Sequence, residues 1–143
     1  MAKLTKEKLI EGLNEDLAFE YAAVIQYRTY ASLVKGPWRQ ELREFFATEI
    51  ADEMTHAQLL ADKVVSLGGI PVVKAADVKV TEDAAKMLQH SLDDEEATVK
   101  RYVERRRQAE ELGEHGLAID LDDLIADETK HRDELRLMLQ RWK

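Results

Sequence analysis

Four long stretches of the 143-residue sequence place apolar side chains at alternating spacings of three and four residues. Glycine and proline interrupt this pattern at three places, around residues 36–37, 68–71 and 113–116. The spacing is typical of helices that pack along their whole length, and the breakers separate one helix from the next. The sequence therefore predicts four helices, over about residues 5–35, 38–67, 81–112 and 117–143.

The connections between these helices differ in length. Short turns join the first helix to the second and the third to the fourth, so each pair is expected to run antiparallel. The middle connection, residues 68–80, is longer and contains four valines, which favours a crossover running along the bundle. We predict an all-α, antiparallel four-helix bundle, one domain over residues 1–143 with two hairpins at about 5–67 and 81–143. Thr5 and Thr81 are predicted to cap the first and third helices.

Each apolar stripe is interrupted by one glutamate near the middle of its helix: Glu20, Glu53, Glu95 and Glu128. An antiparallel bundle brings these four positions to one level inside the core. A single buried glutamate is often a paired or snorkelling side chain. Burying four carboxylates without partners would cost roughly several kcal/mol each, so this layer requires compensating charge.

The same features recur at an offset of 75 residues. The offset pairs Glu20 with Glu95, Tyr27 with Tyr102, Glu53 with Glu128, and His56 with His131. Residues three apart share a helix face, so each Glu-x-x-His pair can direct a carboxylate and an imidazole at one metal ion. Four carboxylates, two neutral histidines and two divalent cations are electrically neutral together. The pattern therefore predicts a dinuclear metal site inside a duplicated bundle.

These motifs resemble the ferritin-like di-iron carboxylate proteins, and most closely the bacterioferritins. The similarity covers about Leu9–Leu139, and its specific parts are Glu20 with Gln26-Tyr27, Asp52-Glu53-Met54-x-His56, and Asp127-Glu128-x-x-His131. The resemblance implies that Glu20 and His56 are terminal ligands of one iron, that Glu95 and His131 serve the other, and that Glu53 and Glu128 bridge.

The resemblance also implies roles for residues around the ligands. Asp52 and Asp127 would each accept a hydrogen bond from the histidine of the opposite hairpin and so orient it. Tyr27 and Tyr102 would donate to the carboxylates or supply an electron, although simple core packing explains them equally well.

Met54 follows Glu53 and should point out of the bundle, about 100° away from the metal layer. In bacterioferritins a methionine at this place ligates haem b across a twofold dimer, whereas the plain interpretation is an apolar interface residue. The predicted outward positions of the first two helices also include Tyr21, Ile25, Tyr30 and Trp38. This apolar surface predicts a homo-oligomer, at least a dimer.

The expected function is that of a ferroxidase: oxidation of Fe(II) by dioxygen or hydrogen peroxide, for iron storage or detoxification. The ligand set suits two iron ions and also manganese. The sequence ends at Lys143, just after the fourth predicted helix, so the short fifth helix of bacterioferritin is not expected and a 24-subunit cage is in question.

Several alternatives remain open at this point. Dps-type miniferritins also lack a fifth helix, but they assemble their metal sites between subunits. Others are a non-storage di-iron or di-manganese oxidase or peroxidase (rubrerythrin-like, without the cysteine-rich domain), a metal buffer, and a purely structural bundle.

Composition excludes several function classes. The absence of cysteine excludes disulfides, thiolate metal sites and thiol nucleophiles. A net charge of −8 argues against a nucleic-acid partner, and the one basic cluster, residues 100–107, is expected to complement the dipole near the end of the third helix. We see no secretory leader and no apolar run of about 20 residues, so we expect a cytoplasmic protein without a membrane partner.

Overall fold

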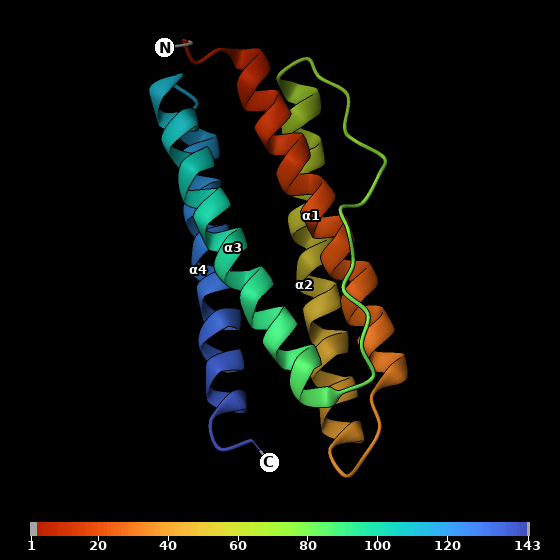
Figure 1. The fold of residues 1–143 in the computed structure, drawn as a ribbon. Coiled ribbons are helices and arrows are strands. Elements are labelled where there is room, and N and C mark those ends of the chain that lie inside the picture. Colours follow the sequence, from red (N-terminus) through yellow and green to blue (C-terminus); the bar gives the residue numbers. More distant parts are fainter. Residues whose placement is uncertain (1–2, 143) are drawn as a thin grey trace.

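The computed structural model describes residues 3–142 and consists of four α-helices joined by loops (Figure 1). Their bounds are α1 Lys6–Leu33, α2 Arg39–Ser66, α3 Ala84–Glu111 and α4 His115–Leu139. Helix α1 packs against α2 and α3 packs against α4, while α1 and α3 make the main recorded contact between the two hairpins. The connection from α2 to α3 runs along α1 for much of its length (Figure 1). The predicted all-α four-helix bundle with a long crossover is confirmed.

The helix ends follow local capping chemistry. Thr5 caps α1 as predicted, accepting a hydrogen bond from the backbone N–H of Lys8 at 3.2 Å. The prediction for Thr81 is wrong: its hydroxyl accepts from the N–H of Asp83, and Asp83 caps α3 by accepting from Lys86 at 3.1 Å. Helix α3 therefore begins three residues later than predicted. Helix α4 begins at His115, two residues earlier than predicted, and ends at Leu139; the last predicted residue, Lys143, lies outside the described residues.

Side chains of α1 hold the crossover in place. The Asn14 amide donates to the carbonyl of Ile70 at 3.1 Å and accepts from the N–H of Val72 at 2.9 Å. Further along, the Gln26 side chain accepts from the N–H of Lys79 at 2.8 Å. These contacts satisfy backbone groups of a segment that has no secondary structure of its own.

The crossover also explains why one predicted surface residue is buried. Tyr30 was expected on the outside of the bundle, but its side chain is 0% exposed and its hydroxyl donates to the carbonyl of Lys79 at 2.6 Å. Its ring packs against Phe46, with ring centroids 5.7 Å apart. By contrast, Ile25, Trp38 and Met54 are about half exposed, at 47%, 54% and 58%.

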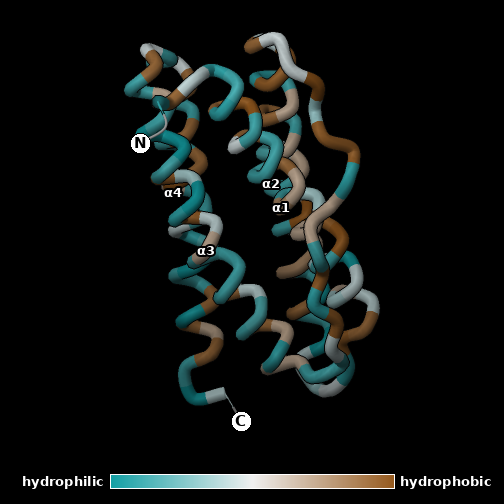
Figure 2. The backbone as a smooth tube through the Cα atoms, turned by 45° about the horizontal axis from the view of Figure 1, so that its top comes forward, coloured by the Kyte–Doolittle hydropathy of each residue, from teal (hydrophilic) through white to brown (hydrophobic). Residues whose placement is uncertain are grey.

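The apolar core is divided into two clusters. Apolar and polar positions alternate along every helix (Figure 2). One cluster is built around Leu13, Leu60 and Leu121, and the other around Tyr30, Phe46 and Leu88. In each helix, the glutamate that interrupts the apolar stripe comes after residues of one cluster and before residues of the other. These four residues, Glu20, Glu53, Glu95 and Glu128, are called the seam glutamates below. Among residues 3–142, none of the helices combines the length and apolarity needed to cross a membrane.

A buried ion pair joins the two hairpins about one turn of α1 before Glu20. Arg105 on α3 donates through Nε and Nη2 to the two carboxylate oxygens of Asp16 on α1, at 2.8 and 3.2 Å. Both side chains are at most 6% exposed. Gly12 makes room for the guanidinium, because a Cβ atom at this position would collide with it.

This ion pair also changes the interpretation of the basic cluster. The last turn of α3 contains no basic residue, so the expected match to the helix dipole is wrong. The arginines instead pair with individual acids. Arg105 binds Asp16, Arg106 binds Asp122 at 2.6 Å, and Arg107 binds Glu104 and Glu111 at 2.6 and 2.8 Å.

Candidate metal centre

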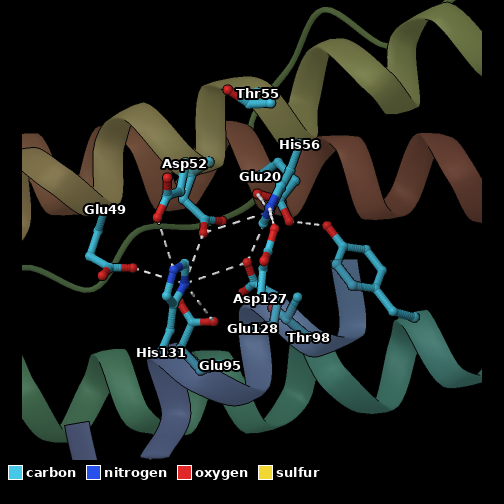
Figure 3. Close-up of polar contacts among 12 residues, drawn as sticks. Glu20, Glu49, Asp52, Thr55, His56, Glu95, Thr98, Asp127, Glu128 and His131 are labelled. Carbon is cyan, nitrogen blue, oxygen red and sulfur yellow. Dashed lines mark hydrogen bonds and ion pairs between the residues drawn. The ribbon is translucent and has the colours of Figure 1, made fainter. Parts of the chain in front are cut away.

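The four seam glutamates, one from each helix, meet in a buried polar layer. Glu20, Glu53, Glu95 and Glu128 are each at most 3% exposed. His56 and His131, one turn after Glu53 and Glu128, are 2% and 9% exposed and turn toward the same layer (Figure 3). The structure thus brings together all six residues that the sequence predicts as ligands.

Their donor atoms form two overlapping groups. One contains Glu20, Glu53, His56 and Glu128, and the other contains Glu49, Glu53, Glu95 and His131. Within each group the possible ligand atoms lie within 4.8 Å of one another. Glu53 belongs to both groups, as a residue between two metal ions would.

Each histidine is held by an aspartate of the opposite hairpin. Nε2 of His56 lies 3.2 Å from Asp127 Oδ2, and Nε2 of His131 lies 3.1 Å from Asp52 Oδ2 (Figure 3). A carboxylate acceptor favours the proton on Nε2, which leaves Nδ1 free to bind a metal ion. Both Nδ1 atoms face the glutamates: His56 Nδ1 is 2.9 Å from Glu128 Oε1.

Two tyrosines reach across the bundle to the terminal glutamates. The hydroxyl of Tyr27 donates to Glu95 Oε1 at 2.8 Å, and that of Tyr102 donates to Glu20 Oε1. Burial and the nearby carboxylates raise the pKa of both phenols well above the usual value. Both therefore remain protonated near neutral pH and can act as fixed hydrogen-bond donors to the carboxylates.

The unpaired polar atoms of this layer provide a test of whether metal ions fit. Among the described residues, nearly all buried side-chain oxygens and nitrogens without a hydrogen-bond partner belong to it, with Arg101 Nε the one recorded elsewhere. They lie on Glu20, Glu49, Glu53, His56, Glu95, Glu128 and His131. Buried polar atoms are rarely left unpaired, and metal ions would supply the missing partners. An oxygen-rich donor set with two imidazoles fits iron or manganese.

Protons occupy part of this layer when no metal is bound. Burial, together with neighbouring carboxylates, raises the pKa of Glu53 and Glu95 well above the usual value, and burial raises that of Glu128 to about 7. Burial lowers the pKa of His131, but Glu49, Glu95 and Asp52 together outweigh this effect and raise it to about 9. Metal binding would therefore displace protons.

The sequence interpretation missed Glu49. This residue lies on α2 one turn before Glu53, is 5% exposed, and places Oε2 2.8 Å from His131 Nδ1. The i, i+4 spacing to Glu53 was the available signal. It was overlooked because the expected pattern contained one glutamate per helix.

Met54 lies apart from the layer, on the outer face of α2. It lines a surface hollow of about 440 Å³ together with Tyr21, Ile25 and residues of the crossover. The assignment of Met54 to haem stays a prediction.

A cavity of about 510 Å³ leads from the surface to the layer. It lies beneath the crossover between α1 and α3. Asp77, Lys79 and Asp94 lie at its exposed end, whereas the buried Glu53 and Glu95 line its inner end. Lys79 Nζ pairs with Asp94 Oδ1 at 2.7 Å at this outer end.

Comparison with known proteins identifies the family. The model of the ferritin-like domain matches residues 10–143. The chain belongs to the ferritin-like family. The bacterioferritin of Streptomyces coelicolor is 31% identical over 136 residues, which span 92% of this chain and 80% of that protein.

Solved structures of this family agree with the assignment. A ferritin-like di-iron carboxylate protein from Bacillus anthracis superposes with a TM-score of 0.93 at 46% identity, over 97% of this chain and 99% of that one. The bacterioferritin of Desulfovibrio desulfuricans, whose di-iron site was studied in several catalytic states, superposes with a TM-score of 0.85 at 25% identity, over 94% and 80%. The resemblance of the sequence to ferritin-like di-iron proteins is therefore confirmed.

Proposed function

We propose that this chain is a di-iron ferroxidase of the ferritin and bacterioferritin type. It binds two Fe(II) ions in the polar layer and oxidises them with dioxygen or hydrogen peroxide, for iron storage or detoxification. The observation that carries the proposal is the set of buried, unpartnered donor atoms in that layer. The assigned ligands are Glu20 and His56 for one ion, Glu95 and His131 for the other, and Glu53 and Glu128 between them.

The reaction balances with these groups. Each Fe(II) ion loses one electron, and hydrogen peroxide takes two electrons and two protons to give two water molecules. With dioxygen, the same two electrons and two protons give hydrogen peroxide. The four glutamates offset the charge of two divalent ions, while Asp52, Asp127 and the two tyrosines fix the donor geometry.

The cavity beneath the crossover is the proposed entry route for these small reactants. It is the recorded cavity that reaches two of the assigned ligands, Glu53 and Glu95.

The direct test is anaerobic loading of the metal-free protein with Fe(II), followed by mixing with each oxidant. We expect two Fe(II) ions per chain and rapid ferric absorbance with at least one oxidant. Two ions bound without rapid oxidation would favour the metal buffer, and the absence of binding would favour a structural bundle. Rapid peroxide turnover with no retained ferric iron would favour the non-storage peroxidase, and manganese in the purified protein would favour the di-manganese alternative.

We also propose that the chain forms a homo-oligomer, at least a dimer. The half-exposed Ile25, Trp38 and Met54 support this, since an isolated bundle has no need of them on its surface. Light scattering should give at least twice the chain mass of 16.4 kDa. If Met54 also binds haem b between two subunits, haem-loaded protein should show a Soret band that Met54→Leu removes.

A further inference from the structure

Glu49 is a buried carboxylate that the six assigned ligands leave unexplained. It lies on the same face of α2 as Glu53 and is 5% exposed. Within residues 3–142, its one recorded ion pair is with His131, and its Oε2 has no hydrogen-bond partner. Burying a carboxylate costs free energy unless a cation, hydrogen-bond donors or a bound proton compensates its charge.

The position of Glu49 makes the surroundings of the two histidines different. The acid nearest His56 Nδ1 is Glu128, at 2.9 Å, which is one of the two glutamates assigned to both ions. At His131, Nδ1 lies 3.6 Å from each of these shared glutamates, and Glu49 is nearer, at 2.8 Å. Nδ1 is the nitrogen that faces the metal layer, so Glu49 Oε2 lies beside the same metal position.

The second hairpin has no counterpart of this carboxylate. The 75-residue offset that pairs all six assigned ligands pairs Glu49 with Leu124. Leu124 is 4% exposed and belongs to an apolar cluster. The carboxylate of Glu49 is therefore a departure from the repeat. It lies beside only one of the two proposed metal positions.

We propose that Glu49 is a further ligand, which gives the metal position at Glu95 and His131 one more carboxylate than the position at Glu20 and His56. This inference rests on the proposed function and deepens it. The two positions become unequal: the Glu49 side carries more negative charge, binds a divalent cation more tightly, and fills first. It also favours the trivalent ion on that side after oxidation, because the additional charge offsets the added positive charge.

The test is a titration of the metal-free wild-type protein with Co²⁺. Calorimetry and the visible absorbance of bound Co²⁺ monitor the binding. We expect two Co²⁺ ions per chain with unequal affinities. Glu49→Gln should weaken the tighter ion about tenfold or more and leave the other within about threefold. Glu44→Gln, an exposed glutamate on the same helix, is the matched control and should change neither affinity.

A second variant tests whether the effect comes from the lost charge when the buried position stays filled. Glu49→Leu places in α2 the residue that α4 carries at the equivalent position, and it should bring the two affinities close together. Anomalous scattering from crystals with one equivalent of Co²⁺ should place the metal beside His131 in the wild type.

Wild-type affinities for both ions in Glu49→Gln, or equal weakening of both, would overturn the inference while leaving the proposed function intact. A wild-type chain that binds fewer than two Co²⁺ ions would overturn the proposed function itself, and the inference with it.

Discussion

The two hairpins carry the same proposed ligands in the same register, yet other positions of the repeat differ between them. Each provides a terminal glutamate, a Glu-x-x-His pair, and an aspartate that holds the histidine of the other. One turn before Glu53, Glu49 corresponds to Leu124 in the repeat, and about three turns after Glu20, Tyr30 corresponds to Arg105. The shared residues surround the polar layer. Among the differing residues, Tyr30 binds the crossover and Arg105 binds Asp16, whereas Glu49 adds a carboxylate to one side of the layer.

The largest expected effect comes from removing the ligands that the hairpins share. Glu53→Gln combined with Glu128→Gln should lower the rate of Fe(II) oxidation by more than the ~10–100-fold typical of losing a supporting residue. The metal-free fold should keep or gain stability, because two repelling carboxylates are lost. Stopped-flow absorbance and urea unfolding check both parts. A sharp fall in metal-free stability would contradict the argument from buried charge.

The next effect tests whether the aspartates act across the hairpins. Asp52→Ala should weaken metal binding beside His131, and Asp127→Ala should weaken it beside His56, each by about 10–100-fold. Calorimetry with Co²⁺ measures this, and Asp123→Ala on the exposed face of α4 is the control. The idea fails if either variant affects both ions equally.

The metal-free protein should lose stability as pH rises from 5 to 9. The folded-state pKa values of Glu53, Glu95 and Glu128 are raised, so their contribution is full below about pH 4.3 and falls as pH rises. For Glu128, whose pKa is about 7, it is lost through neutral pH. His131, at about 9, adds a contribution that is full below about pH 6.5 and is lost through pH 9. Urea unfolding in the presence of a chelator at pH 5, 7 and 9 measures the trend.

The double glutamine variant is the control for this pH dependence. It lacks two of the titrating carboxylates, so its stability should change less between pH 5 and pH 9. A wild-type profile that is flat or rises with pH would show that the layer does not hold protons in this way.

The smallest effect concerns the ion pair that distinguishes α3 from α1. Gly12→Ala should cost about 1–3 kcal/mol of unfolding free energy, because the added methyl displaces an Arg105 guanidinium held by Asp16. Gly116→Ala, where nothing lies within 4 Å of the new Cβ, should gain up to about 1 kcal/mol. Thermal and urea unfolding measure the change in unfolding free energy for both variants. Equal changes would rule out a collision between the new methyl group and Arg105.

The helices, and the meeting of the six proposed ligands in one layer, could be predicted from the sequence because each signal was local and repeated. A glutamate in an apolar stripe is anomalous within its own helix, and each such glutamate has an equivalent 75 residues away. Glu49 was missed because its counterpart is Leu124, so the repeat conceals it. Tyr30 was placed on the surface because the segment that covers it lies about fifty residues further along the chain, beyond the reach of helical periodicity. Thr81 was predicted as the cap, but Asp83, two residues later, is the side chain that accepts from the first turn of α3, while Thr81 accepts from Asp83 itself.

The Asp16–Arg105 pair has a consequence for how the hairpins align. Helices with regular apolar seams can slide along one another by a turn, about 5.4 Å, with little change in buried apolar area. Such a slip would separate Glu20 from Glu95 while keeping the core covered. A bidentate pair buried beside a glycine tolerates no such displacement, since it would leave two isolated charges in the core. The pair thus sets the longitudinal position of α1 against α3, and with it the level at which the four carboxylates meet.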